Sequence, residues 1–198
     1  MDIVILEPID WRVFKAIRLE ALRLEPGAFG STYEFEAKQT AAFFRQRLTN
    51  NTVFTLWQPG QSEDASPKSG FAQGMLGLGQ LKGPQERHKA FLWGMYVQAS
   101  LRGTGLGSEM LQAALDFAAQ QVEQVLLTVA ASNTVALNFY RRAGFQEYGK
   151  EPRALKIADS RYEAEILMVK MLTRRGHAPS RPFPWNKRTA QDLSERGI

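Results

Sequence analysis

The sequence predicts one α+β domain in which helices flank a mixed, mostly antiparallel sheet. Two patterns support this fold class. Three successive runs of β-branched and aromatic residues in the middle of the chain favour an antiparallel meander. The last of these runs is followed by a helix and a further strand, which favours one parallel crossover. The length of 198 residues suits a single well-buried core and is short for two.

The first third of the chain is predicted to be mainly helical. Residues 2–6 (DIVIL) indicate a short strand, and Asp10 then caps a helix whose apolar side chains lie roughly on one face. Proline and glycine break this helix. Ser31 and Glu34 have the spacing of a capping box, so a second helical stretch is expected to run in pieces toward Leu48.

Strands then dominate the middle of the chain. The three runs are 52–57 (TVFTLW), 71–81 (FAQGMLGLGQL) and 90–97 (AFLWGMYV), with polar loops between them. Apolar residues at helical spacing then predict a helix that ends near Gln121. Residues 122–130 (VEQVLLTVA) are nearly all apolar, which indicates a strand buried on both faces.

The predicted domain closes with one helix and two strands. The helix begins at Ser132 or Asn133, and Gly144 supplies the left-handed residue that commonly follows a helix. The two strands cover 154–157 (ALKI) and 162–172 (YEAEILMVKML). The domain is therefore expected to end with this last strand.

A basic tail follows the predicted domain of residues 1–172. Residues 173–198 contain six Lys or Arg against two Asp or Glu, so they carry +4 of the formal net charge of +5. Their prolines argue against further sheet. Such a tail can contact nucleic acid, but Phe183 and Trp185 are its only aromatic residues, so nucleic-acid binding is the less favoured interpretation.

Composition excludes several classes of protein. The hydrophobic content of 44% is ordinary for a globular domain, and no apolar run approaches the roughly 20 residues that span a bilayer. No basic region precedes the first apolar run, so we expect a cytoplasmic protein with no membrane partner. The absence of cysteine excludes disulfides, thiolate metal ligands and a cysteine nucleophile. His88 and His177 are far apart in the sequence, so no metal site is expected.

The stretch RGTGLGSEML, residues 102–111, is the strongest functional motif. Its G-x-G-x-G spacing differs from the dinucleotide-binding G-x-G-x-x-G, and it lacks the lysine of a nucleotide-triphosphate loop. A glycine-rich turn that leads into a helix points backbone N–H groups outward, where the helix dipole favours an anion such as a pyrophosphate. Arg102 adds a cation. The same loop can also be a tight turn that holds no ligand.

Two neighbouring segments favour a ligand-binding loop over a tight turn without a ligand. MYVQASLRGTGLGSEML, followed by LLTVAASNTVALNFYRRAGF, resembles the GNAT superfamily of acyl-CoA-dependent N-acyltransferases. The shared features are a valine that closes a strand, R-x-x-G-x-G, a further strand, an asparagine, a helix that carries a tyrosine, and G-F. The resemblance is sharpest over residues 93–145, and the order of elements fits from residue 2 to about 172. It does not cover the tail.

The resemblance implies a GNAT-like sheet in which two neighbouring strands splay apart and bind CoA. It further implies that backbone groups of Tyr96 and Val97 pair with the pantetheine arm, as an added strand would. Asn133 would hydrogen-bond the pantetheine, Tyr140 would lie beside the sulfur, and Arg142 would lie near the adenosine end. The pyrophosphate would be held by Arg102, Gly103, Thr104, Gly105, Leu106 and Gly107, and Ser108 follows in the same loop.

The chemistry implied is acetyl transfer from acetyl-CoA to a primary amine, with no metal. Direct attack requires a neutral amine, and deprotonating a lysine-like amine at pH 7 costs roughly 4.6 kcal/mol, so a base or a desolvating pocket is needed. A phenol such as Tyr140 can protonate the departing thiolate. Several relatives carry a glutamate in the strand before the glycine loop, but residues 90–97 contain no acid.

The sequence therefore identifies neither the general base nor the acceptor substrate. Candidates for the base are Glu34, Glu36 and His88, and a water relay is an equal alternative. Arg153 and Tyr162 are candidates to line the acceptor site, where the acceptor is a small-molecule amine or a protein amine. A homodimer is a possible assembly. Two other functions compete with the enzyme: a noncatalytic acyl-CoA-binding sensor, and a nucleic-acid-associated protein that uses the basic tail.

Overall fold

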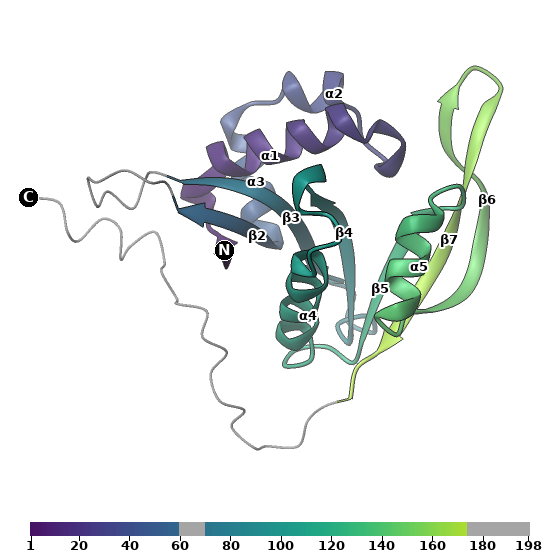
Figure 1. Ribbon diagram of the computed structural model, residues 1–198. Helices are drawn as coiled ribbons and strands as arrows, with labels where there is room; N and C mark the ends of the chain where they lie inside the picture. Colours follow the sequence, from purple (N-terminus) through teal and green to yellow (C-terminus); the bar gives the residue numbers. More distant parts are fainter. Residues whose placement is uncertain (60–69, 174–198) are drawn as a thin grey trace, which may run out of the picture.

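The computed structural model describes residues 1–59 and 70–173, which form one sheet covered by helices (Figure 1). The seven strands lie in the order β1-β2-β3-β4-β5-β7-β6. Only β4 and β5 pair in parallel, and the other neighbours are antiparallel. The α+β class with a mixed, mostly antiparallel sheet is therefore confirmed. The predicted tail from residue 174 onward lies outside the described residues.

The elements follow the predicted order. The strands are β1 (Asp2–Leu6), β2 (Thr52–Pro59), β3 (Gly70–Gln80), β4 (Lys89–Val97), β5 (Gln124–Ala130), β6 (Gln146–Ala158) and β7 (Arg161–Met171). The helices are α1 (Trp11–Leu24), α2 (Tyr33–Ala37), α3 (Ala41–Asn50), α4 (Leu106–Ala118) and α5 (Thr134–Arg142). Three short 3-10 turns are η1 (Pro8–Asp10), η2 (Pro26–Ala28) and η3 (Ala99–Leu101).

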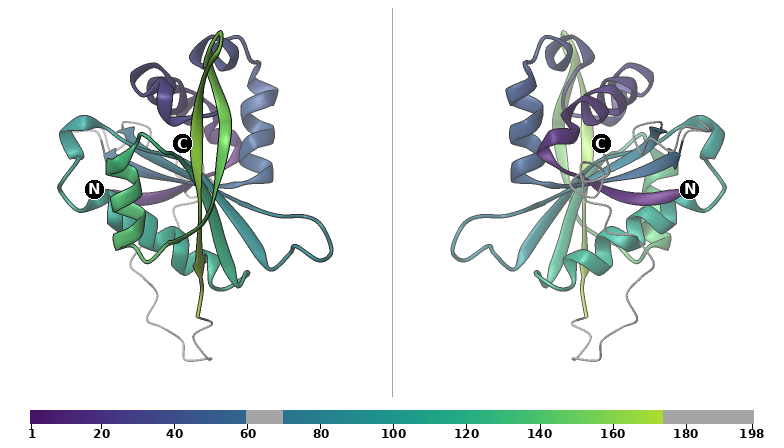
Figure 2. Two further views of the ribbon diagram at one scale, coloured as in Figure 1. Left: turned by 90° about the vertical axis from the view of Figure 1, so that its right-hand side faces the viewer. Right: turned by 90° about the vertical axis from the view of Figure 1, so that its left-hand side faces the viewer.

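The sheet separates two hydrophobic cores. Along β2, Phe54 and Leu56 pack with α4 and α5, whereas Val53 packs with α1 and α3 on the other face. This alternation follows from the two-residue period of a strand. Figure 2 shows the same division, with α1, α2 and α3 on one side of the sheet and α4 and α5 on the other. None of the helices in the described ranges is long and apolar enough to cross a membrane.

Two predicted helix caps are wrong in detail. Asp10 precedes α1, but its carboxylate accepts a hydrogen bond from the backbone N–H of Glu7 instead of capping the helix. Thr32, not Ser31, caps α2, because its extended backbone places the hydroxyl against the N–H of Phe35. The hydroxyl of Ser31 instead bonds to the carboxylate of Glu36.

Two further predictions need correction. The fourth helix ends at Ala118 rather than near Gln121, and its last residues give way to a turn. The strand β5 is fully buried only on the face that packs under α4 and α5, where Val125 and Leu127 lie. On its other face Leu126 and Thr128 are only partly buried, whereas Ala130 is buried.

Candidate functional site

The strands β4 and β5 separate part-way along their length. They pair at three positions, the last of which joins Phe91 to Leu126. Beyond this point β4 continues to Val97 and β5 to Ala130 without further pairing between them. A bulge at Gly94, whose φ is +67°, bends β4 where the gap opens. The edge of β4 that faces the gap is therefore available to another extended group.

Only one of the two predicted pantetheine-pairing residues presents its backbone to this gap. The N–H of Gln98 donates to the carbonyl of Gln73 on β3, and neighbouring residues of a strand point their backbone groups to opposite edges. Tyr96 therefore faces β3 and Val97 faces the gap. The side chain of Tyr96 is buried, and its hydroxyl donates a hydrogen bond to the Glu20 carboxylate at 2.9 Å.

The glycine loop lies at the mouth of the gap. Gly103 and Gly105 have φ values of +79° and +93°, and a side chain at either position would meet no atom within 4 Å. The loop therefore borders open space. Within the described part of the chain, the backbone N–H groups of Gly103, Gly105, Leu106 and Gly107 donate to no backbone carbonyl. Four free donors before and at the start of α4 are an arrangement that is able to accept an anion.

Arg102 turns away from the free N–H groups. Its Nε donates to the carbonyl of Val97 at 3.0 Å, and its Nη2 pairs with Glu25 at 2.6 Å. Both partners of this ion pair are well exposed, so the pair contributes at most about 1 kcal/mol. Arg102 could exchange Glu25 for a phosphate at little cost.

The helix α5 supplies the residues predicted beside the pantetheine. The side-chain oxygen of Asn133 caps the helix by accepting from the N–H of Ala136 at 3.0 Å, which leaves its amide N–H₂ as a donor. Tyr140 is 6% exposed and packs edge-on against Phe139 and Phe145. Burial raises the pKa of the Tyr140 hydroxyl well above its usual value. Arg142 is exposed in the last turn.

The structure argues against two of the three predicted base candidates, Glu36 and His88, and leaves Glu34 untested. Glu36 is fully buried, and Arg18 and Arg47 bind its carboxylate. Burial by itself raises the pKa of Glu36, but hydrogen bonds and charge from the two arginines outweigh it, so the pKa lies below its usual value. Glu34 is exposed on α2, and His88 precedes the end of β4 remote from the glycine loop. A nine-residue strand spans roughly 30 Å, which separates His88 from the site.

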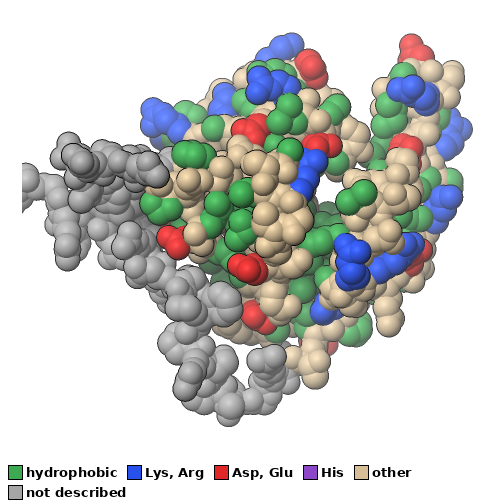
Figure 3. Space-filling view, in the orientation of Figure 1, with side chains coloured by type: hydrophobic (Ala, Val, Ile, Leu, Met, Phe, Trp, Pro, Cys, Tyr) green, Lys and Arg blue, Asp and Glu red, His purple; other side chains and the backbone are tan. Residues whose placement is uncertain are grey.

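Arg153 and Tyr162 do come together, on the β6–β7 hairpin. The guanidinium of Arg153 lies over the Tyr162 ring at 3.9 Å. A pocket of about 360 Å³ opens between this hairpin and the segment after α1, and Figure 3 shows the hollow beside the hairpin. The lining residues are Gly27, Ser132, Ile157, Arg161, Tyr162 and Glu163. Tyr162 thus lines a pocket that the hairpin shares with η2 and with Ser132.

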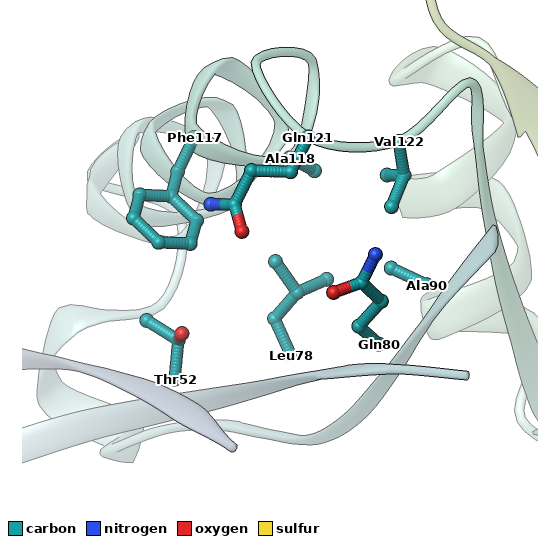
Figure 4. A pocket seen from close by; sticks show the side chains of 8 residues that line it. All are labelled: Thr52, Leu78, Gln80, Ala90, Phe117, Ala118, Gln121 and Val122. Carbon is teal, nitrogen blue, oxygen red and sulfur yellow. The ribbon is translucent and has the colours of Figure 1, made fainter. Parts of the chain in front are cut away.

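A second, smaller cavity has no part in the site. It measures about 40 Å³ and lies at the C-terminal end of α4, remote from the glycine loop (Figure 4). Its lining residues are Thr52, Leu78, Gln80, Ala90, Phe117, Ala118, Gln121 and Val122. This volume is far too small for an acyl-CoA.

Sequence reasoning missed one half-buried acid, Glu165 on β7. It lies opposite Ala130 of β5 and close to the hydroxyl of Thr128. Burial raises its pKa, the charge of Glu151 adds to the rise, and the Thr128 hydrogen bond opposes it. The only signal in the sequence is an acid that interrupts the apolar run of the last strand.

The gap, the loop and α5 match a known family. The model of the acetyltransferase (GNAT) family matches residues 22–145. The chain belongs to the GNAT family. The resemblance read from the glycine loop and the α5 segment is thereby confirmed, and the GNAT domain indicates an acyltransferase enzyme.

Solved GNAT structures share the fold. An acetyltransferase of the GNAT family from Streptococcus pneumoniae has a TM-score of 0.69 at 20% identity, over 86% of this chain and 98% of its own. A ribosomal-protein-alanine N-acetyltransferase from Brucella melitensis has a TM-score of 0.65 at 20% identity, over 87% of this chain and 100% of its own. A Salmonella typhimurium acetyltransferase structure with its cofactor acetyl-CoA has a TM-score of 0.65 at 19% identity, over 92% of this chain and 98% of its own. At these identities the likeness shows the GNAT fold alone.

Proposed function

We propose that this GNAT protein transfers the acetyl group of acetyl-CoA directly to a primary amine of a small molecule or a protein. The observation that carries the proposal is the gap between β4 and β5, which opens beside a loop with four free backbone N–H groups. An extended pantetheine arm fits the unpaired edge of β4, and a pyrophosphate fits the start of α4. The acetyl-CoA in the Salmonella typhimurium structure supports this choice of donor.

Each contact has a specific role in the proposal. The free backbone N–H groups of residues 103, 105, 106 and 107 hold the pyrophosphate, and Thr104 and Ser108 belong to the same loop. Arg102 adds a charge-assisted bond to a phosphate. Val97 offers its backbone to the pantetheine, and Asn133 offers its amide N–H₂. Arg142 lies at the adenosine end. Together these residues bind and orient the thioester.

Tyr140 is the proposed acid. The acceptor amine attacks the thioester carbonyl, and the departing thiolate needs a proton. A tyrosine hydroxyl is protonated at neutral pH and therefore carries a proton to donate. Burial raises the pKa of Tyr140, so its hydroxyl gives up this proton only to a basic group, such as a desolvated thiolate, held against it. A noncatalytic acyl-CoA sensor would need no proton donor at the sulfur, so Tyr140 favours the enzyme over the sensor.

The substitution Tyr140→Phe tests this role. It removes the proton donor and keeps the buried ring, so CoA affinity measured by calorimetry should change little. Turnover of acetyl-CoA, followed by thiol release with a panel of primary amines, should fall by about 10²-fold or more. Tyr148→Phe is the matched control, because Tyr148 is exposed on β6. Normal turnover by the Tyr140 variant would make solvent the proton source.

A further inference from the structure

We propose that Glu165 is the general base that deprotonates the acceptor amine, an assignment that rests on the acetyl transfer proposed above. The sequence alone offers no acid on β4 for this role, Glu36 is buried in an ion pair, and His88 lies at the end of β4 remote from the glycine loop. Glu165 is the acid on the neighbouring strands whose position and surroundings fit the task.

Glu165 lies on the face of the sheet opposite α4 and α5. In the β5–β7 ladder, Leu127 and Met168 are partners whose side chains enter the core under those helices. Because side chains alternate between faces, Thr128, Ala130 and Glu165 point to the other face. The phosphate loop and Tyr140 therefore approach the gap from one face, and Glu165 borders it from the other.

The carboxylate of Glu165 leans over β5 toward the gap. It lies close to the hydroxyl of Thr128, which belongs to the part of β5 beyond Leu126 that no longer pairs with β4. One edge of this segment pairs with β7 and the other edge borders the gap. A single strand, about 5 Å wide, therefore separates Glu165 from the gap. An amine that contacts Glu165 therefore lies within reach of a thioester held in the gap between β4 and β5.

The segment between α1 and α2 covers this face and leaves an entrance. The turn η2 packs against β5. A Cβ built on Gly30 would lie 3.8 Å from Leu155 Cδ2, so the segment also touches β6. The open pocket includes Gly27 and Glu163, and Glu163 is two residues, or about 7 Å, from Glu165 along β7. An acceptor in this pocket approaches Glu165 from solvent.

The charges on the strands next to Glu165 are acidic, which suits a base that receives an ammonium group, whereas the cations Arg153 and Arg161 lie toward the tip of the β6–β7 hairpin. β6 contributes Glu151, its cross-strand partner. β7 contributes Glu163, whose carboxylate accepts from the backbone N–H of Ser132 at 3.0 Å. β5 contributes the neutral Thr128, and η2 has no titratable side chain. Burial and the charge of Glu151 raise the pKa of Glu165, so its carboxylate binds a proton more tightly than an exposed glutamate does.

The proton transfers balance. The ammonium group of the acceptor gives one proton to the carboxylate of Glu165, which leaves a neutral amine. The nitrogen then forms a bond to the thioester carbonyl carbon, and the C–S bond breaks with its electron pair on sulfur. Tyr140 gives its proton to the thiolate and regains one from the attacking nitrogen. Glu165 releases its proton to water.

Glu165→Gln tests the proposal with benzylamine, which is protonated at pH 7, and aniline, which is neutral. With benzylamine, kcat/KM should fall by about 10²-fold or more at pH 7, and the deficit should shrink as pH rises toward the pKa of the amine. With aniline the variant should match the unchanged protein, because a neutral amine needs no base. CoA affinity should be unchanged. Glu123→Gln, an exposed acid before β5, is the matched control.

If the wild-type protein acetylates neither amine, this outcome counts against the proposed function. A second measurement tests the role of Glu165 in that case as well. Carboxyl ¹³C NMR of the full chain, assigned with the Glu165→Gln variant, should show that the pKa of Glu165 lies above the usual value for a glutamate. A midpoint at or below that of an exposed glutamate would overturn the assignment. So would an equal loss of activity with benzylamine and aniline, since that pattern indicates a merely structural role.

Discussion

The buried carboxylate of Glu36 supports a quantitative prediction. Arg18 donates to it from Nε and Nη2 at distances between 2.8 and 3.2 Å, and Arg47 adds a bond of 3.2 Å. Glu36→Gln keeps the shape of the side chain but removes the negative charge. Arg18 is 3% exposed, so its guanidinium would be left buried without a counter-charge.

The loss of stability follows from the burial of the Arg18 guanidinium. Breaking a buried pair by removing one partner destabilises a protein by about 3–5 kcal/mol. In a domain of this size, that should lower Tm by roughly 6 to 20 °C. Replacing both partners, as in Arg18→Met with Glu36→Leu, should cost less than the single change, because no buried charge remains. Arg47 is partly exposed and can turn to solvent.

Thermal unfolding followed by circular dichroism at several pH values is the assay. The pKa of Glu36 is lowered in the folded state, so its stabilising effect is complete above the unfolded pKa of about 4.5 and is lost as pH falls through the folded pKa. The difference in Tm between the variant and the unchanged protein should therefore narrow in acid. A Tm within 1 °C of the unchanged protein at pH 7 would refute the reasoning. A specific loss of kcat in the folded variant would restore Glu36 as a base.

Three other changes test separate features. Glu165→Gln should raise Tm at pH 8 and leave it unchanged at pH 4, because the raised pKa means that ionising Glu165 costs stability as pH rises through it. Gly94→Ala should lower Tm, because φ is +67° and the new Cβ would lie 3.1 Å from Met75 Cε. A chain ending at Thr173 should fold and bind CoA by calorimetry; loss of soluble expression would instead show that the tail packs as structure.

Local patterns predicted the framework well. Strand and helix order followed from hydrophobic period, and the glycine loop was located because φ values of +79° and +93° at Gly103 and Gly105 require glycine. The start of α5 was predicted at Ser132 or Asn133, because both side chains are among the few that bond the first turn of a helix, and Asn133 is the cap.

Partners distant in sequence could not be predicted. Glu36 lies in a helix of five residues, too short to show which face is buried, and its arginine partners come from two other helices. Arg102 pairs with Glu25, which only the folded chain brings near. Glu165 acquires its position because β7 lies between β5 and β6, an order that the sequence does not reveal.

The most direct test of the central claim is calorimetric titration of CoA into Gly105→Val and Gly144→Val. Both glycines have left-handed φ values, +93° and +87°, so both variants carry similar backbone strain. Gly105 lies in the loop with free N–H groups, and Gly144 follows α5, where only the flexible end of Lys170 lies near. We predict that the Gly105 variant loses CoA affinity by tenfold or more and the Gly144 variant retains it. Equal affinity in the Gly105 variant and the unchanged protein would contradict a phosphate site in this loop.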